Sequence, residues 1–545
     1  MPFRTEETIS APPQAGSDES TKRPLRWRRE ALWVVIAVLA VVVVLGCMLA
    51  AKWPFTRAAL TQSLEQDSQA QVEIGSYRET YFPHPGCVAE NVIIHRDTSS
   101  PKLTVRRLTI VGSYVGMLHR YIPSVIAEGA ILDVPLGGLK NLFASNGNQQ
   151  PTGTSVGEID ADDAQIVVAT HDEDHPLAFQ FHQLRLKDID KDSAVHFIAA
   201  LQTPEPTGDL QLQGKIGPFR RDQAGSTPLA GTYSFKNAKL EEFTGFGGVL
   251  SSDGKFNGQL QAINVNGSTE TPDFQLDVGI HPVDLKTKFH ALVNGTNGDL
   301  QLDPVTSSWG KTSVTWTGTI QGPDEAKAQK TVTLDMTSTS ARVQDLLILF
   351  VHDEQSPMSG AINFRAHVTL LPGPEAFWHR LRLQDEFEIR DGKFTRHETQ
   401  QEVEILSARA RGQADKIEDD QDRDRKNGTD TVDRDLQPVV SSFKGRVFLR
   451  DGIAHFSDLS FDVPGATALL NGTYAIQSQR IDAQGTAHME TKLYKATTGV
   501  KSFLLKVIGP LRPHKSGDKG STVLVHVTGT YGHPSFAVQQ IKGGQ

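Results

Sequence analysis

The chain has 545 residues, a formal net charge of -9, and 38% hydrophobic and 22% charged residues. Beyond residues 1–30 it has no clustered basic face, so its composition argues against a nucleic-acid partner. Its two cysteines, Cys47 and Cys87, cannot form a disulfide within the region after residue 51. The 47 glycines and 28 prolines are typical of many short strands joined by tight turns.

The N-terminal segment predicts a membrane anchor. Residues 1–30 are polar, which indicates a disordered tail, and residues 31–51 form an uncharged apolar run long enough to span a bilayer as a helix. Five basic residues between 22 and 29 precede this run, so the positive-inside rule places the tail in the cytoplasm. A cleaved signal sequence and a lipoprotein anchored through Cys47 fit less well, because the run is long and continues past Cys47.

After the anchor we expect four segments. The unit at 52–143 begins with a short helix at 55–68 and continues with strands, and a polar linker at 144–157 follows it. Residues 158–412 alternate apolar and polar side chains, which predicts strands with one apolar face. Residues 413–437 are a charged, disordered loop, and residues 438–545 form a C-terminal β region. Helical pattern is scarce, with candidates at 341–351 and 491–507.

Short turn motifs indicate that the strands are mainly antiparallel. Acidic-Gly pairs supply the positive φ of tight hairpins, and they occur at Glu128-Gly129, Asp253-Gly254, Asp391-Gly392 and Asp451-Gly452. Asn-Gly-Ser/Thr triplets at Asn266, Asn294 and Asn471 formally match a glycosylation acceptor but are better explained as hairpin turns. The one-sided strands leave two architectures open. They can pack as a β-sandwich, or they can curl into a trough whose apolar wall meets a ligand.

Several segments resemble the AsmA-like family of envelope proteins, which is related to TamB and to bridge-like lipid-transfer proteins with repeating β-grooves. The resemblance starts with the anchor, and the further segments are Trp53-Pro54-Phe55, Val72-Glu73-Ile74-Gly75, Tyr81-Phe82-Pro83-His84-Pro85, Phe443-Lys444-Gly445-Arg446-Val447, Phe456-Ser457-Asp458, Leu470-Asn471-Gly472 and Val527-Thr528-Gly529-Thr530. It implies a mainly β fold: a single N-terminal transmembrane helix followed by an elongated, curled antiparallel β-sheet, or β-groove, with a few short helices.

The implied function is passage of phospholipid along the groove between the inner and outer membranes of a diderm bacterium. The protein would then be a single-pass inner-membrane protein with most of the chain in the periplasm, and its partners would be membrane lipids and a protein in the periplasm or outer membrane. The alternative is a periplasmic β-sandwich scaffold that assists envelope or outer-membrane protein assembly without transport. The residues expected to line the groove are Leu210, Leu212, Phe274, Leu276, Val278, Ile280, Val332, Leu334, Phe364, Val368, Phe387, Ile389, Val523 and Val525.

No catalytic motif is evident, so we expect neither an enzyme nor a cofactor. The one dense group of metal-ligand types, His171-Asp172-Glu173-Asp174-His175, lies between two apolar runs and is better explained as a polar hairpin loop. We therefore expect no metal site.

Overall fold

The computed structural model describes residues 53–540 except for 69, 97–99, 136–153, 170–175, 191–192, 220–222, 244, 278, 323–329, 374, 413–438, 491–505, 508–520 and 531–532. The predicted tail, the predicted transmembrane helix at 31–51 and the predicted charged loop at 413–437 therefore lie outside the described residues. Among the helices that are described, none combines the length and apolar character needed to cross a membrane. The chain divides into two compact units, Met1–Leu60 and Thr61–Gln545.

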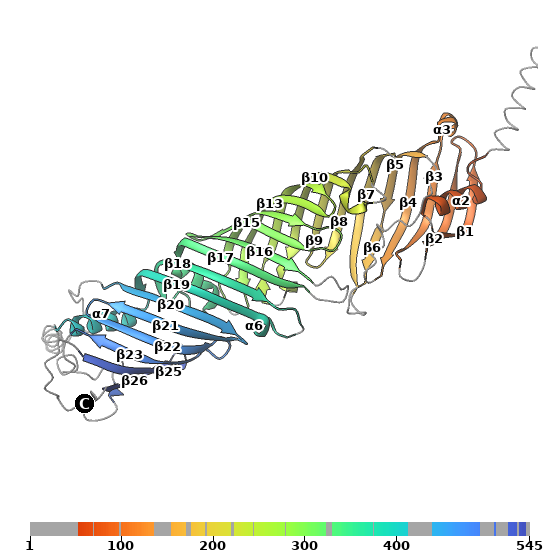
Figure 1. Cartoon of the computed structure of the whole chain (residues 1–545). Helices are drawn as coiled ribbons and strands as arrows, with labels where there is room; N and C mark the ends of the chain where they lie inside the picture. Colours follow the sequence, from red (N-terminus) through yellow and green to blue (C-terminus); the bar gives the residue numbers. More distant parts are fainter. Residues whose placement is uncertain are drawn as a thin grey trace, which may run out of the picture. The chain divides into compact units, whose positions relative to one another are not determined.

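The fold is mainly β and consists of one long curled sheet (Figure 1). The described residues contribute 26 strands to it, two of which, β11 and β24, have two residues each. In the first half these are β1 (Gln71–Thr80), β2 (Gly86–His95), β3 (Lys102–Val111), β4 (Tyr121–Val134), β5 (Ser155–Asp162), β6 (Ala164–Val168), β7 (Leu177–Ile189), β8 (Val195–Pro204), β9 (Thr207–Ile216), β10 (Pro228–Lys239), β11 (Phe246–Gly247), β12 (Val249–Gln259) and β13 (Ala262–Leu276).

The second half continues with β14 (Val283–Val293), β15 (Leu300–Trp309), β16 (Thr312–Gln321), β17 (Thr331–Arg342), β18 (Met358–Leu370), β19 (Leu381–Phe394), β20 (Ser441–Arg450), β21 (Ile453–Val463), β22 (Ala466–Ala475), β23 (Arg480–Met489), β24 (Lys506–Val507), β25 (Ser521–Thr530) and β26 (His533–Gln540). Strand order largely follows chain order, and most pairs are antiparallel as predicted. The parallel pairs are β4 with β5, β4 with β6, and β24 with β26.

Helices are short, and the predictions for them hold only in part. The helix expected at 55–68 is α2 (Arg57–Ser68), where Thr56 Oγ1 accepts a hydrogen bond from Ala59 N at 3.2 Å and caps the first turn. The candidate at 341–351 shrinks to α5 (Val343–Leu347) and the 3-10 turn η3 (Ile348–Phe350). Of the candidate at 491–507, only Lys506 and Val507 are described, and they form strand β24 rather than a helix.

Other helical segments were not predicted. They are α3 (Tyr114–His119), α6 (Phe377–Arg380), α7 (His397–Ala410), and the 3-10 turns η1 (Ala224–Ser226) and η2 (Leu240–Glu242). The linker expected at 144–157 is also shorter than predicted where it can be followed, because β5 already begins at Ser155.

Some of the predicted turns lie inside strands. Asp451-Gly452 does form the β20–β21 turn, and both residues have the positive φ that such a hairpin requires. Gly129 and Asp391 also have positive φ, but they interrupt β4 and β19, and a register shift accompanies Asp391. Asp253-Gly254, Asn266 and Asn471 are ordinary strand residues, so those turn predictions were wrong. Asn294 is in the turn between β14 and β15.

The pairing register aligns apolar residues across the sheet. Directly paired residues of neighbouring strands project from the same face, so their side chains form rows across the strands. One row, here called the paired row, has a hydrophobic residue at every position except three glycines and one aspartate: Tyr77, Ala89, Leu108, Ala127, Ala161, Leu184, Ala199, Leu212, Tyr233, Gly254, Gly267, Phe289, Val305, Trp316, Met336, Ala366, Asp385, Val447, Phe456, Gly472, Ala483 and Val527. The face that carries it is called the apolar face.

Candidate functional site

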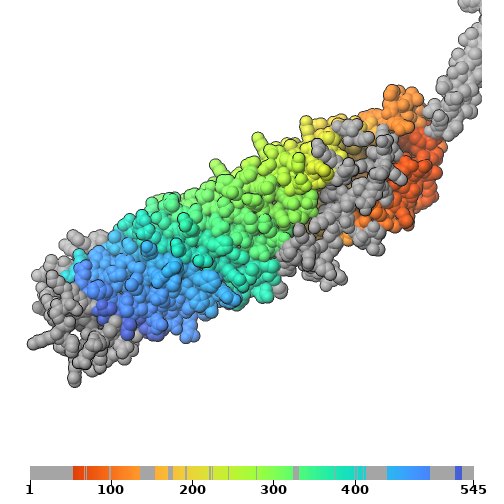
Figure 2. Space-filling view, in the orientation of Figure 1, coloured from red at the N-terminus to blue at the C-terminus, as the bar shows by residue number. Residues whose placement is uncertain are grey.

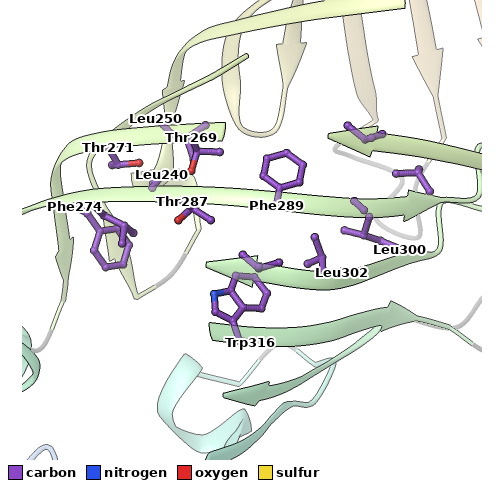
Figure 3. Close-up of a pocket in the computed structure, with 15 residues that line it drawn as sticks. Leu240, Leu250, Thr269, Thr271, Phe274, Thr287, Phe289, Leu300, Leu302 and Trp316 are labelled. Atoms are coloured by element: carbon purple, nitrogen blue, oxygen red, sulfur yellow. The ribbon is translucent and has the colours of Figure 1, made fainter. Parts of the chain in front are cut away.

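A cavity of about 410 Å³ lies against the apolar face where strands β12 to β16 meet (Figure 3). Its wall is almost entirely hydrocarbon: Leu240, Leu250, Val265, Thr269, Thr271, Phe274, Leu285, Thr287, Phe289, Ala291, Val293, Leu300, Leu302, Val305 and Trp316. Phe289, Val305 and Trp316 also belong to the paired row. The cavity is therefore part of the apolar face and not a separate site.

Two register shifts bring the lining residues together. In β13 the pairing with β14 shifts between Thr271 and Phe274, so Thr271 faces Leu285 while Phe274 faces Val283. Without this irregularity, residues of odd and even number could not share one face of the strand, because side chains alternate along it. A second shift, between Leu302 and Val305 in β15, has the same effect.

Beside Phe274, which lines the cavity, aromatic rings from distant parts of the chain pack together. The ring centroids of Phe274 and Phe246 are 6.3 Å apart, and Phe246 lies edge-on to Phe377 of α6 at 5.2 Å. Gly245 has a φ of +101°, and a Cβ built there would lie 3.0 Å from Cγ of Phe377, so the backbone approaches the ring closely. A side chain at this position would be strained as well as crowded.

These contacts join opposite edges of the sheet. Because strands alternate in direction, the connections after β10 and β13 lie on one side of the sheet, where these strands end, here called the first edge. The connection after β18 lies on the other side, at the opposite ends of the strands, here called the second edge. The β18–β19 connection contains α6, and its Trp378 Nε1 donates a hydrogen bond to Asp277 Oδ1 at 3.2 Å. Strands β14 to β18 separate the two in the sheet, so the sheet curls until the two edges meet.

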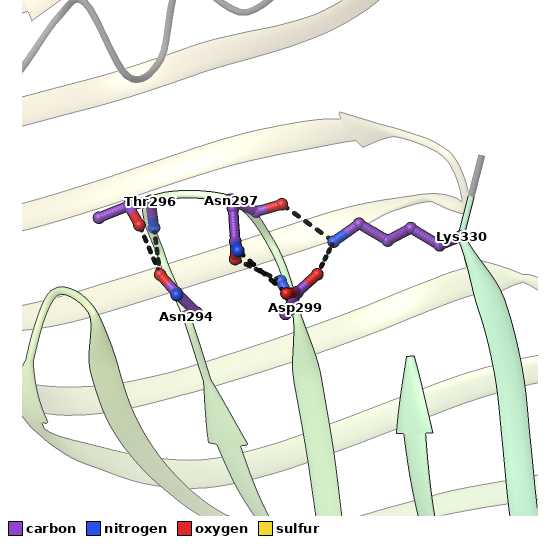
Figure 4. Close-up of polar contacts among 5 residues, drawn as sticks. All are labelled: Asn294, Thr296, Asn297, Asp299 and Lys330. Atoms are coloured by element: carbon purple, nitrogen blue, oxygen red, sulfur yellow. Dashed lines mark hydrogen bonds and ion pairs between the residues drawn. The ribbon is translucent and has the colours of Figure 1, made fainter. Parts of the chain in front are cut away.

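At the second edge the cavity ends beside a polar turn (Figure 4). Lys330, just before β17, donates from Nζ to Asn297 O at 2.9 Å and forms an ion pair with Asp299 Oδ1 at 3.1 Å. Asn294 Oδ1 accepts hydrogen bonds from Thr296 N and Oγ1. Although burial opposes it, the hydrogen bond and charge of Lys330 lower the pKa of the Asp299 carboxyl below its usual value. The apolar wall at Leu300 thus gives way directly to charged and amide groups.

The predicted lining residues are distributed along the apolar face. Phe274 lines the cavity, and Leu276 pairs with Phe246 beside it. Leu210, Leu212, Val332, Leu334 and Val368 are half-buried. Leu334 pairs with Val368 across the strands, and Val332, two residues earlier on the same face of β17, pairs with Leu370. Ile280 is not in a strand, since β13 ends at Leu276, and it is 52% exposed. Val278 lies outside the described residues.

The remaining predicted residues pack against helices of the same chain. Ile389, Phe364 and Phe387 belong to a cluster with Val343 and Leu346 of α5. Val523 and Val525 pack with Ala410 at the end of α7 and with Met489. At these two places the apolar face is covered, so these side chains contribute to a closed core and not to an open wall. The short helices could not be anticipated as covers from strand periodicity alone.

One side chain departs from the apolar character of the paired row. Asp385 stands between Ala366 and Val447 in the cross-strand register, and its Oδ1 is buried without a hydrogen-bond partner. Burial raises the pKa of this carboxyl to about 6, which the backbone amides of Arg365 and Glu386 only partly offset. Its position in phase with Leu381, Leu383 and Phe387 was visible in the sequence and would have identified it.

Within the described residues no group of three or more His, Cys, Asp or Glu side chains is arranged to hold a metal ion, and the loop at 171–175 lies outside them. The single described cysteine, Cys87, is a buried free thiol. In comparisons with family models, with curated proteins and with solved structures, the chain matches none.

Proposed function

We propose that this chain is a membrane-anchored periplasmic protein that binds phospholipid and moves it along a hydrophobic β-groove between the inner and outer membranes. The observation that carries the proposal is the paired row, which runs from β1 to β25 through the cross-strand register and has Asp385 as its one charged member. An ordinary protein core does not need hydrophobic residues aligned from strand to strand along a whole sheet, whereas a lipid that moves along the sheet does.

The cavity has the properties that an acyl chain requires. Its volume of about 410 Å³ falls within the roughly 300–1,000 Å³ that small-molecule sites occupy. A sixteen-carbon chain exposed to water costs on the order of 12 kcal/mol, at about 0.8 kcal/mol per methylene. An apolar wall removes most of that cost without a catalytic group or nucleotide.

The polar groups at the second edge can interact with the headgroup of such a lipid. The turn that contains Asn294 and Asp299, together with Lys330, sets amide, carboxylate and ammonium groups immediately beside Leu300. A polar headgroup would remain hydrated there while its acyl chain lies on the apolar wall. The resemblance of the anchor and of the C-terminal segments to AsmA-like proteins points in the same direction. A scaffold built from packed β-sandwiches is less well supported, because the described strands join one sheet.

Lipid content of the purified full-length chain tests the proposal. We expect phospholipid to co-purify with the wild type and to be lost from the Phe289→Asp variant, since a carboxylate in the cavity wall repels an acyl chain. Leu292→Asp is the matched control, because Leu292 lies on the same strand but on the exposed face. Circular dichroism establishes that both variants remain folded. A wild type free of lipid, or equal lipid in both folded variants, would contradict the proposal.

A further inference from the structure

An exposed apolar tip is formed by the β1–β2 turn and by α3. Phe82 is 85% exposed, Leu118 81% and Val115 69%, and the rings of Tyr81, Tyr114 and Tyr121 are also exposed. The two segments come from different hairpins, yet they are joined, because Tyr114 Oη donates a hydrogen bond to the carbonyl of Tyr81. Figure 1 shows α3 at the end of β3 and β4, and this part of the chain is orange on the surface in Figure 2.

The tip is held in shape by its own backbone. Ser113 Oγ accepts a hydrogen bond from Gly116 N at 2.9 Å and caps α3, and Arg120 in the left-handed conformation ends the helix. Gly116 is buried so closely against Tyr121 that a Cβ there would lie 2.4 Å from the carbonyl oxygen. Because the backbone of α3 is fixed in this way, the exposure of Val115 and Leu118 is a stable property of the surface.

The charges around the tip are one-sided. Residues 80–86 and 112–124 contain no Asp or Glu, whereas Arg120, His119 and His84 are exposed among the apolar side chains. Glu79, two positions before Tyr81, accepts a hydrogen bond from the hydroxyl of Tyr81. Tyrosine rings, aliphatic side chains and a positive charge together are the composition that settles at the headgroup level of an anionic bilayer.

The position of the tip in the chain favours a bilayer over a protein partner. Tyr81 follows the last residue of the predicted membrane span by 30 positions (81 minus 51), and such a stretch cannot extend more than about 100 Å. A surface tethered this close to a bilayer meets it at high effective concentration, so even weak apolar contacts suffice to hold it there.

We propose that this tip, formed by residues 81–84 and 114–121, inserts into the headgroup layer of the bilayer that holds residues 31–51. The inference rests on the membrane anchor of the proposed function and not on lipid transfer. Insertion of the tip and lipid transfer can therefore be disproved separately. Tyr77, the first member of the paired row, is on the strand that leads into the tip, and docking would bring the start of the row to the lipid surface.

The test uses the full-length chain with Cys47→Ser, reconstituted into vesicles of phosphatidylcholine and phosphatidylglycerol. His119→Cys on α3 carries an environment-sensitive fluorophore, and Leu469→Cys, on an exposed position of β22, is the control. Cys87 is 1% exposed, so its thiol is shielded from the labelling reagent. We expect nitroxide-labelled lipids to quench the label at 119 and not at 469, and the emission at 119 to shift to the blue.

A second variant separates insertion from mere proximity. Replacing Phe82 and Leu118 by Ser, with the label still at 119, should return its emission and its quenching by aqueous iodide to those of the control position. A label at 119 that is as accessible to iodide as the one at 469, in the unmodified chain, would overturn the proposal and leave a protein partner as the occupant of the tip. Unchanged lipid quenching after removal of Phe82 and Leu118 would overturn it as well.

Discussion

Trp378 donates its indole N–H to the carboxylate of Asp277, 101 positions earlier in the chain, and so joins the two edges of the sheet. The bond is accompanied by the edge-on packing of Phe246 on Phe377. Together these contacts close the curl of β13 to β19 around the apolar face. They also lie beside the cavity, because Phe246 contacts the ring of Phe274, which lines it.

The coupling across the edges can be measured. We expect Trp378→Phe and Asp277→Ala each to lower the free energy of unfolding by about 1 kcal/mol, because each removes one partner of a partly exposed hydrogen bond to a charged group. The double variant should lose hardly more than either single one, since only one interaction is present. Asp277→Asn keeps an acceptor oxygen and serves as the control. Additive losses in urea denaturation would show that the two residues do not interact.

Filling the cavity should displace its ligand without introducing charge. Val265 lines the cavity from β13, and a Val265→Trp variant should carry less co-purified phospholipid while unfolding at a temperature close to that of the wild type. Asn264→Trp adds the same ring on the opposite face of the strand and should leave the lipid content unchanged. Lipid is measured by mass spectrometry of the extracted protein. Equal lipid in both variants would indicate that acyl chains do not occupy this space.

The buried carboxyl of Asp385 should reduce stability at neutral pH. Its pKa is raised from 3.8 to about 6 by burial, so the folded state retains a proton that the unfolded state releases. Stability from this group therefore falls as pH rises from about 4 to about 6 and is constant above that. We expect Asp385→Asn to raise the free energy of unfolding by about 2 kcal/mol at pH 7.5, with no gain at pH 3.5. Glu270→Gln, at an exposed position of β13, is the control.

The Lys330–Asp299 pair should show the opposite dependence on pH. Asp299 has a lowered pKa in the folded state, so its contribution is present above the pKa of the unfolded chain and disappears as pH falls through the folded value. Lys330→Met should lower the free energy of unfolding by about 0.5 kcal/mol at pH 7, because the pair is partly exposed, and by nothing measurable near pH 2. Lys288→Met, on the exposed side of β14, should have no effect at either pH. If Lys330→Met lowers the free energy of unfolding equally at both pH values, the cause is lost packing and not the ion pair.

The alternation of apolar and polar side chains determined the class of fold. One-sided strands such as β14 and β17 have the period of two that a half-buried strand requires, and short antiparallel connections make neighbours in sequence neighbours in space. The apolar side of most strands was therefore evident from local pattern, and Phe274 was correctly placed on it. Asp385 was equally visible as the one acid in phase with apolar neighbours.

Only the tertiary structure decided which part of that apolar face is open. The register shifts at Thr271 and at Leu302 depend on pairing with another strand, so no periodicity within β13 or β15 reveals them. A helix was predicted at 341–351, where α5 lies, but no pattern within it or within α7 indicates that these helices pack over Ile389 and Val523 and remove them from the open wall. The contact of Trp378 with Asp277 arises because the sheet curls, and curling is a property of the paired strands together rather than of any single segment.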